Sequence, residues 1–181
     1  MKVCGIILAK ENSNRFPGKN YKEYKGKPLF EHSLDLIRQF VKIEDIYICT
    51  DSSTIKIFCN GKYNIINRYC NVNRDDEPYL SVLKYAYQFI AKSYDIIITV
   101  LANSINHDAE AIIEGIRILE KYDKIQEVRS FDSDGIQNGI FLFREEFVLN
   151  CNSTLHEMGY IYDPGKEIHY KEELDERTSM D

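Results

Sequence analysis

Paired cysteines and clustered histidines are missing from this sequence of 181 residues. Its five cysteines are an odd number without C-x-x-C spacing and its four histidines are scattered, so no zinc site of the Cys/His type is predicted. Cys4 and Cys49 lie in apolar runs, where a thiol behaves as a small hydrophobe. We therefore interpret the cysteines as reduced structural residues.

Long apolar runs are missing as well. No stretch approaches the roughly 20 consecutive apolar residues of a membrane span, so no membrane partner is expected. Met1-Lys2 leads directly into a strand-like run rather than into a signal peptide. These two observations predict a cytoplasmic location.

The sequence also has no excess of basic residues. The chain has 23 Lys and Arg against 29 Asp and Glu, which gives a formal net charge of -6. A general nucleic-acid binder needs a basic face that displaces the counterions of the phosphates. We therefore expect no nucleic-acid partner, and any cationic site must be local.

What is present is the composition of an ordinary globular domain, with 44% hydrophobic and 29% charged residues. The length suits one domain that buries about two thirds of its unfolded surface. No internal repeat or linker-like stretch divides the chain. We assign residues 1–181 to a single domain.

Strand-like and helix-like patterns alternate along most of the chain. Short apolar runs predict strands, and apolar residues at helical spacing predict helices. The expected strands are 2–9, 45–50, 63–66, 95–101, 126–130, 139–143 and 158–162, and the expected helices are 29–41, 53–59, 79–91 and 108–122. Alternation of this kind predicts a Rossmann-like three-layer α/β/α fold with a mostly parallel central sheet, which binds ligands at the carboxyl ends of its strands.

A loop with three cations follows the first predicted strand. Its sequence, A-K-E-N-S-N-R-F-P-G-K-N, places Lys10, Arg15 and Lys19 within ten residues, among Ser, Asn and Gly residues that permit tight turns and expose N–H groups. It matches neither the dinucleotide-binding G-x-G-x-x-G nor the P-loop. Three cations alone are more typical of a solvated loop, but the position at the expected ligand edge favours a polyphosphate site.

This loop resembles that of the CMP-sialic acid synthetases and related acylneuraminate cytidylyltransferases. Their pattern A-R-x-G-S-K-R-x-P-x-K-N shares Ala9, Ser13, Arg15, Pro17, Lys19 and Asn20 with this chain, and G-K-P-L follows in both. The segments I-C-T-D at 48–51 and N-G-I-F at 138–141 are further, weaker matches. The resemblance implies a nucleotidyltransferase fold and the transfer of CMP from CTP to a small acidic acceptor, with release of pyrophosphate.

The resemblance also implies roles for individual residues. Lys10 and Lys19 would contact the triphosphate, and Arg15 would lie beside the leaving phosphates. The expected nucleotide-binding set is Ala9, Ser13, Asn14, Asn20, Arg68 and Ser81, with Asn20 near the ribose and Arg68 near the base. Two simpler interpretations stay open, namely that Asn20 closes a turn and that Arg68 is a surface side chain.

A divalent cation, Mg²⁺ or Mn²⁺, is the implied cofactor. The family's D-x-D pair appears here as Glu167 and His169, and these two residues are the predicted metal ligands. Mg²⁺ prefers oxygen ligands and gains little from a neutral imidazole, so His169 is equally well explained as a hydrogen-bonded surface residue. Asp51 also lies at the ligand edge, but we expect it to cap the helix that follows it.

The acceptor site departs from the family pattern. The stretch Q-P-T-S-P-L-R, which helps to hold the sugar acid in the family, is L-A-N-S-I-N-H at 101–107 and has lost its Gln and Arg. A sugar acid is the expected acceptor, while a sugar phosphate or a phosphonate, or a non-catalytic relative that only binds nucleotide, stays open. The interval between Leu119 and Asn138 is too short for the family's dimerisation segment, so a homodimer of the usual kind is not assumed.

Overall fold

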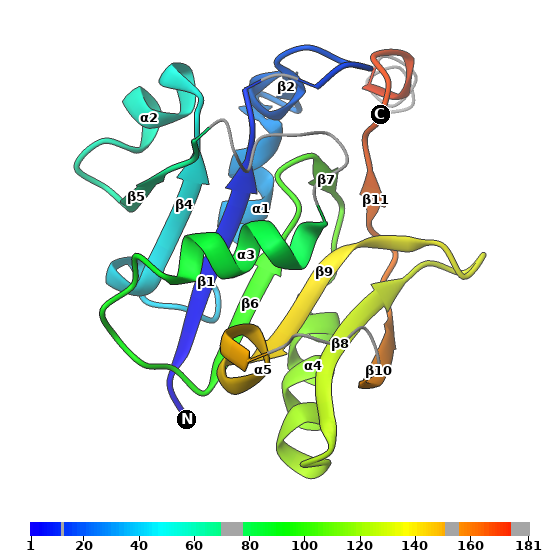
Figure 1. Cartoon of the computed structure of the whole chain (residues 1–181). Helices are drawn as coiled ribbons and strands as arrows, with labels where there is room; N and C mark the ends of the chain where they lie inside the picture. The colour runs from blue at the N-terminus through cyan, green and yellow to red at the C-terminus, as the bar shows by residue number, and fades with distance from the viewer. Residues whose placement is uncertain (12, 70–77, 151–155, 175–181) are drawn as a thin grey trace.

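The computed structural model describes residues 1–11, 13–69, 78–150 and 156–174. Its centre is a seven-stranded sheet with the strand order β10-β8-β9-β6-β1-β4-β5 (Figure 1). Within the described residues, β9 runs antiparallel to both of its neighbours and the other strands of this sheet run in one direction. The strands are β1 (Val3–Ala9), β4 (Ile46–Thr50), β5 (Asn64–Asn67), β6 (Ile96–Val100), β8 (Ile125–Phe131), β9 (Gln137–Arg144) and β10 (Glu157–Tyr162).

Helices cover both faces of this sheet. One face packs against α1 (Leu29–Ile37), α2 (Ser53–Cys59) and α4 (Ala109–Lys121), whose buried side chains share one apolar cluster with the sheet. The opposite face packs against α3 (Tyr79–Tyr87) and α5 (Glu145–Asn150), which lie in front of the sheet in Figure 1. The predicted three-layer α/β/α fold with a mostly parallel sheet is therefore confirmed.

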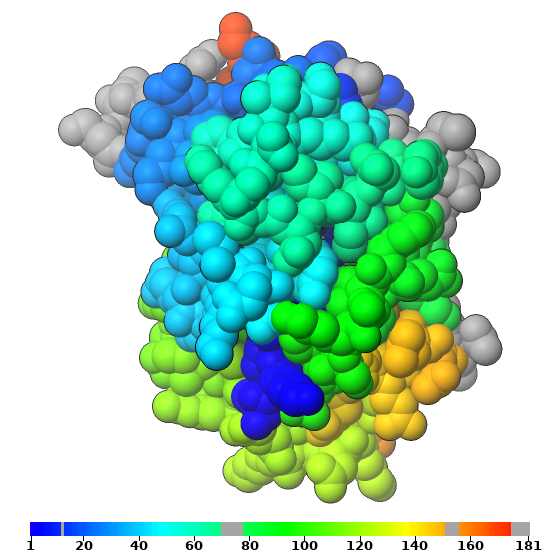
Figure 2. Space-filling view, turned by 90° about the vertical axis from the view of Figure 1, so that its left-hand side faces the viewer, coloured from blue at the N-terminus to red at the C-terminus, as the bar shows by residue number. Residues whose placement is uncertain are grey.

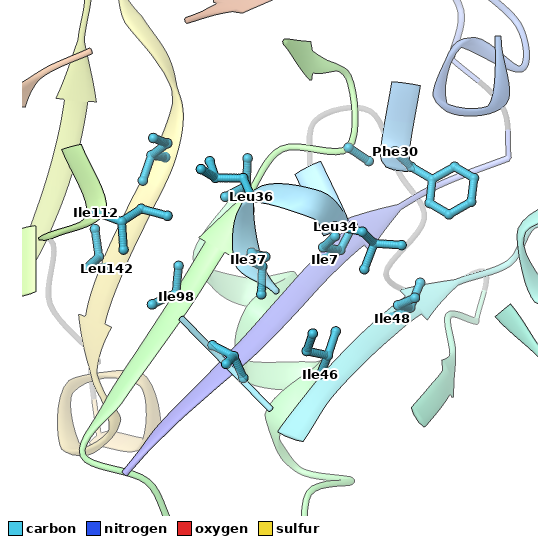
Figure 3. Close-up of a cluster of buried hydrophobic side chains, with 14 of the residues drawn as sticks. Ile7, Phe30, Leu34, Leu36, Ile37, Ile46, Ile48, Ile98, Ile112 and Leu142 are labelled. Carbon is cyan, nitrogen blue, oxygen red and sulfur yellow. The ribbon is translucent and has the colours of Figure 1, made fainter. Parts of the chain in front are cut away.

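The core explains why the strands are apolar on both sides. Phe30, Leu34 and Ile37 on α1 point towards Ile7 and Ile48 of the sheet (Figure 3), and all five side chains are almost fully buried. Each such side chain contributes about 1.5–3 kcal/mol when it leaves water. The parallel strands lie between two such layers, so they read as continuous hydrophobic runs rather than as alternating patterns.

The helices end earlier than their apolar patterns predict. α1 stops at Ile37 instead of residue 41, and α3 stops at Tyr87 instead of residue 91. Val41 is nevertheless buried in the core cluster, because the turn that follows the helix stays packed against the sheet. Burial thus extends the apolar pattern beyond the last helical hydrogen bond.

Several short elements were not predicted. They are α5, the 3-10 turns Lys19–Tyr21 and Ile43–Asp45, the hairpin of β2 (Glu23–Tyr24) and β3 (Lys27–Pro28), and the antiparallel pair of β7 (Ser104–Ile105) and β11 (Lys166–Glu167). Two-residue strands are too short to show a period in the sequence. The pair of β7 and β11 matters most, because it brings the end of the chain to the carboxyl edge of the sheet (Figure 1).

The described cysteines behave as predicted. Cys4, Cys49 and Cys59 are free and buried, and burial raises the pKa of the Cys49 and Cys59 thiols to about 11. Cys70 and Cys151 lie outside the described residues. The N-terminal residues lie at the end of the sheet opposite the loop that follows β1, beside the segments 40–45 and 92–94, which follow α1 and α3 (Figure 2). None of the described helices is long and apolar enough to span a membrane.

Asp163 holds together the part of the chain that follows β10. Its side chain is fully buried and accepts hydrogen bonds from His107 Nδ1 at 2.6 Å, from the backbone N–H of Asp108 at 2.8 Å and from Asn138 Nδ2 at 3.0 Å. Asn138 also donates to the backbone oxygens of Asp163 and Gly165. One carboxylate thereby ties the turn before β11 to the start of α4 and to β9.

We predict that Asp163→Ala lowers the free energy of unfolding by about 3 kcal/mol, because it leaves several buried donors without an acceptor. Urea unfolding measures this loss. Asp134→Ala is the matched control, since Asp134 lies exposed in the turn between β8 and β9 and its removal should change the free energy of unfolding by less than about 0.5 kcal/mol. Equal stabilities of the two variants would contradict the role given to Asp163.

Candidate functional site

The cationic loop leaves β1 at the carboxyl edge of the sheet and is closed by two hydrogen bonds. Asp51, at the end of β4, accepts one from the backbone N–H of Glu11 at 2.7 Å. Asn20 Nδ2 donates the other to the backbone oxygen of Lys10 at 2.8 Å, so the two ends of the loop are joined. The loop is therefore anchored to the neighbouring strand and does not extend into solvent.

A glycine turn places Lys19 in the loop. Gly18 has a φ of 68°, and a Cβ at this position would lie within 3 Å of the Tyr21 ring, so only glycine fits without movement. The backbone N–H of Lys19 bonds to Phe16 O at 3.2 Å. The tight turn thus directs Lys19 back towards the sheet edge.

A small apolar cluster joins this loop to the end of the chain. Phe16 is buried beside Leu29, Ile105 and Ile168, which come from three other segments. Ile168 is further held by a reciprocal pair of 2.8 Å hydrogen bonds to the backbone and side chain of Asn103. Its flanking residues in sequence, Glu167 and His169, are consequently held next to the cationic loop.

The charges of these segments act on one another. Burial is the main reason why the pKa of Lys19 is lowered, and the neighbouring charges of Arg15 and Lys10 lower it further, whereas Glu167 opposes the shift. Burial likewise raises the pKa of Glu167, against the charges of Lys19 and Arg15. These mutual effects indicate that the charges of the loop lie near Glu167.

His169 lies beside the carboxylate. Its Nε2 is 3.4 Å from Glu167 Oε2, and burial together with Lys19 and Arg15 lowers the pKa of the ring. Its Nδ1 is buried without a hydrogen-bond partner. The backbone N–H groups of His169 and Tyr170 both donate to Glu173 Oε2, a residue that the sequence reasoning missed.

The other predicted residues differ in their exposure. Ala9 is fully buried at the end of β1, so only its backbone can serve a ligand. Ser13 is buried and Asn14 is exposed on the loop. Asn20 is only 4% exposed, and its Oδ1 is buried without a partner. Asn20 therefore closes a turn, as the simpler interpretation held, and it also offers an unused acceptor.

Arg68 and Ser81 lie on the other side of the sheet edge. Arg68 follows β5, where its backbone N–H bonds to Thr50 O at 3.1 Å. Burial raises the pKa of Cys49 and of Tyr79, and the charge of Arg68 opposes both shifts. Ser81 is half-buried in the first turn of α3. Arg68 is half-buried, which is compatible with the surface side chain of the simpler interpretation.

The prediction that Asp51 caps a helix is wrong. The cap of α2 is Ser52, whose Oγ accepts from the backbone N–H of Ile55 at 3.3 Å. The carboxylate of Asp51 instead accepts a hydrogen bond from the backbone N–H of Glu11, in the loop at the sheet edge. Three adjacent residues of a cap sequence offer equivalent oxygens, so only the tertiary contact decides which one caps.

The arrangement suits an anionic ligand and a hard cation. Lys19 is partly desolvated and the charges of Lys10 and Arg15 act on it, and electrostatic interactions are stronger in such surroundings than in water. Glu167 is a carboxylate within this group, and one or two carboxylates are sufficient for Mg²⁺ when phosphates supply further oxygens. Among the described residues, no group of three or more His, Cys, Asp and Glu side chains could hold a metal alone.

The sequence has relatives among cytidylyltransferases. The 3-deoxy-manno-octulosonate cytidylyltransferase 2 of Hydrogenovibrio crunogenus is 39% identical over 56 residues, which cover 31% of this chain and 23% of the relative. The match thus spans about a quarter of that relative's length.

Solved structures are similar over almost the whole chain. The CTP complex of CMP:2-keto-3-deoxy-manno-octonic acid synthetase has a TM-score of 0.76 at 12% identity, with 99% of this chain and 98% of that chain covered. The manganese complex of Rv0371c from Mycobacterium tuberculosis H37Rv has a TM-score of 0.67 at 12% identity, with 90% and 88% covered. At these identities the likeness establishes the fold.

The sequence profile described as cytidylyltransferase matches residues 4–100, which is more than half of the chain and includes the whole cationic loop. This chain therefore belongs to the cytidylyltransferase family.

Proposed function

We propose that this protein transfers CMP from CTP to a small sugar acid and releases pyrophosphate. The observation that carries the proposal is the contact of Phe16, in the loop with Lys10, Arg15 and Lys19, with Ile168, the residue after Glu167. The charges of Lys19 and Glu167 act on each other accordingly. Membership of the cytidylyltransferase family supports CTP as the nucleotide. The acceptor class is taken from the 3-deoxy-manno-octulosonate relative, which is 39% identical to this chain over 56 residues.

In this reaction an acceptor hydroxyl attacks the α-phosphorus of CTP. The new bond joins the acceptor oxygen to that phosphorus, the bond to the bridging oxygen of the β-phosphate breaks, and the hydroxyl proton is released to solvent. Such transfers depend on positioning and on neutralising the charge that develops on the leaving group. Lys10 and Lys19 would hold the triphosphate, and Arg15 would stabilise the departing pyrophosphate.

The partial burial of Lys19 supports this role. Desolvation makes the charged form of Lys19 unfavourable, so the site gains when an anionic phosphate replaces the lost water. Asn20 offers its unpartnered Oδ1 as an acceptor for a hydroxyl, which fits a ribose. Backbone N–H groups around Ser13 and Asn14 would complete the phosphate cradle, with Ala9 contributing only backbone and with Arg68 and Ser81 towards the base.

A divalent cation fits this site through Glu167. The charges of Lys19 and Arg15 act on the carboxylate. The buried Nδ1 of the neighbouring His169 has no hydrogen-bond partner in the protein and could bind a metal. Oxygen ligands suit Mg²⁺, whereas imidazole suits transition metals, so Mn²⁺ is the better fit if both residues bind. The bound cation would neutralise phosphate charge.

We predict that Lys19→Ala lowers the rate of CTP-dependent pyrophosphate release by about 100-fold or more, because it removes a desolvated charge from the triphosphate. The measurement is pyrophosphate release with 3-deoxy-manno-octulosonate or N-acetylneuraminate as the acceptor. Lys22→Ala is the matched control, since Lys22 is exposed three residues later in the same loop and should keep nearly the full rate.

A folded Lys19→Ala variant with the full rate would reject the assignment of this loop. If the wild-type protein instead gains thermal stability with CTP, as mass action requires for a bound ligand, but releases no pyrophosphate with any acid, sugar phosphate or phosphonate, it is a non-catalytic relative.

We predict a second, pH-dependent effect from Glu167→Gln. Because burial raises the pKa of Glu167 above its ordinary 4.5, the folded state binds more protons than the unfolded state just above that pH. The contribution of Glu167 to the free energy of unfolding must therefore fall as pH rises through this window, and then level off. The free energy of unfolding of the wild type minus that of Glu167→Gln should show this decline.

Urea unfolding of both proteins between about pH 4 and about pH 8 measures this difference. Mn²⁺ with CTP should stabilise the wild type at the upper end of the range and the variant less. A difference that rises with pH would contradict the buried environment assigned to Glu167.

A further inference from the structure

One end of the sheet is covered by a helix on only one face. α4 packs against β8 through Ile112 and Leu119, which share a cluster with Val128. On the opposite face, α3 and α5 lie over β1, β6 and β9, and among the described helices none lies over β8 and β10 (Figure 1). The side chains of β8 on this open face include Glu127 and Arg129.

Arg129 is held on this face by a buried carboxylate. Its Nε donates to Glu127 Oε1 at 2.5 Å and its Nη2 donates to Glu127 Oε2 at 3.2 Å. Glu127 Oε2 also bonds to His156 Nε2 at 2.6 Å. The Glu127 side chain is 2% exposed, whereas that of Arg129 is 33% exposed. The carboxylate is thus buried, and the guanidinium that it holds is partly exposed.

This arrangement leaves donors for a ligand. A guanidinium has five N–H groups in a rigid fork. Glu127 accepts from two of them, and Gln137 Oε1 accepts from Nη1 at 3.3 Å. A buried ion pair is weak evidence for stability, because apolar residues often replace it without loss. Its clear consequence here is a fixed guanidinium plane with remaining donors at the surface.

Aromatic rings connect Arg129 to the candidate site. The guanidinium carbon lies 5.9 Å from the ring centroid of Phe141, and Phe141 stacks on Tyr79 with centroids 4.7 Å apart. β11, which carries Glu167, lies beside β9, which carries Phe141. Arg129 and Glu167 therefore both lie next to β9.

The segment 101–107 does not supply a cation for the acceptor. Two of its polar residues are occupied in holding the fold, because Asn103 pairs with Ile168 and His107 pairs with Asp163. Leu101, which stands where the family pattern has Gln, is apolar. A charged group for an acid must come from another element.

We propose that Arg129 binds the carboxylate of the acceptor and selects acids over neutral sugars, with Glu127 and His156 as positioning residues. A planar carboxylate matches the fork of a guanidinium, which can donate to both oxygens. This inference rests on the proposed cytidylyltransferase activity. It gives the acceptor-binding cation to β8, an element different from the one that carries it in the resembling family.

The test compares Arg129→Gln, Arg129→Lys and the control Arg117→Gln, since Arg117 lies on the exposed face of α4. The acceptors are 3-deoxy-manno-octulosonate and its carboxamide. Arg129→Gln should raise the KM for the acid by roughly ten- to a hundredfold while the KM for CTP changes less than about twofold. The variant should also lose the preference for the acid over the amide, and Arg129→Lys should recover part of it.

Glu127→Gln tests the positioning role. It should raise the KM for the acid and leave the stabilisation by CTP unchanged, because we assign the triphosphate to Lys10, Lys19 and Arg15 and not to this residue. An unchanged acceptor KM in Arg129→Gln would overturn the inference, and so would an equal loss for CTP and acid. A parallel loss in Arg117→Gln would overturn it as well.

A thermal-shift arm separates this inference from the proposed function. If the wild type releases no pyrophosphate, but the acid still raises its Tm and Arg129→Gln abolishes that shift, the inference holds and the proposed activity fails. If the acid gives neither turnover nor a shift while CTP does, the inference fails.

Discussion

The candidate site depends on placing opposite charges where water is partly excluded. Lys19 and Glu167 are far apart in the sequence. Burial lowers the pKa of Lys19 and raises the pKa of Glu167, so it favours the neutral form of each, and the attraction between their charges opposes both shifts. Such a pair is poorly solvated without a ligand. A polyphosphate with a divalent cation would supply the charges that the water no longer screens, which gives a physical reason for a nucleotide at this edge.

The remainder of the fold serves to hold these segments together. Because β1 and β4 are parallel neighbours, the loop after β1 begins at the same sheet edge where β4 ends, and Asp51 can accept a hydrogen bond from Glu11. The apolar contact of Phe16 with Ile168 joins that loop to β11. Asp163 then fixes the turn before β11 by accepting hydrogen bonds from two other segments, His107-Asp108 and β9. Apolar packing and one buried carboxylate therefore control the position of Glu167.

The fold was largely predictable because its signals are local. Buried parallel strands appear as apolar runs, and helices between them appear as apolar residues at a period of 3.6. Errors arose where the local sequence was equally compatible with two structures. The helix ends were placed too late since buried residues such as Val41 continue the pattern after the hydrogen bonds stop. Asp51 was assigned to a cap that Ser52 makes.

For the site, the sequence alone determined the cationic loop and, through its resemblance to cytidylyltransferases, the expectation that Glu167 and His169 belong with it. Only the tertiary structure decided that these segments meet, since the pairing of β7 with β11 involves residues far apart in the chain and leaves no period in either. It alone also revealed the pairing of Arg129 with Glu127 on an open sheet face. Local patterns encode which faces are buried, whereas contacts between distant side chains exist only once the sheet has brought them together.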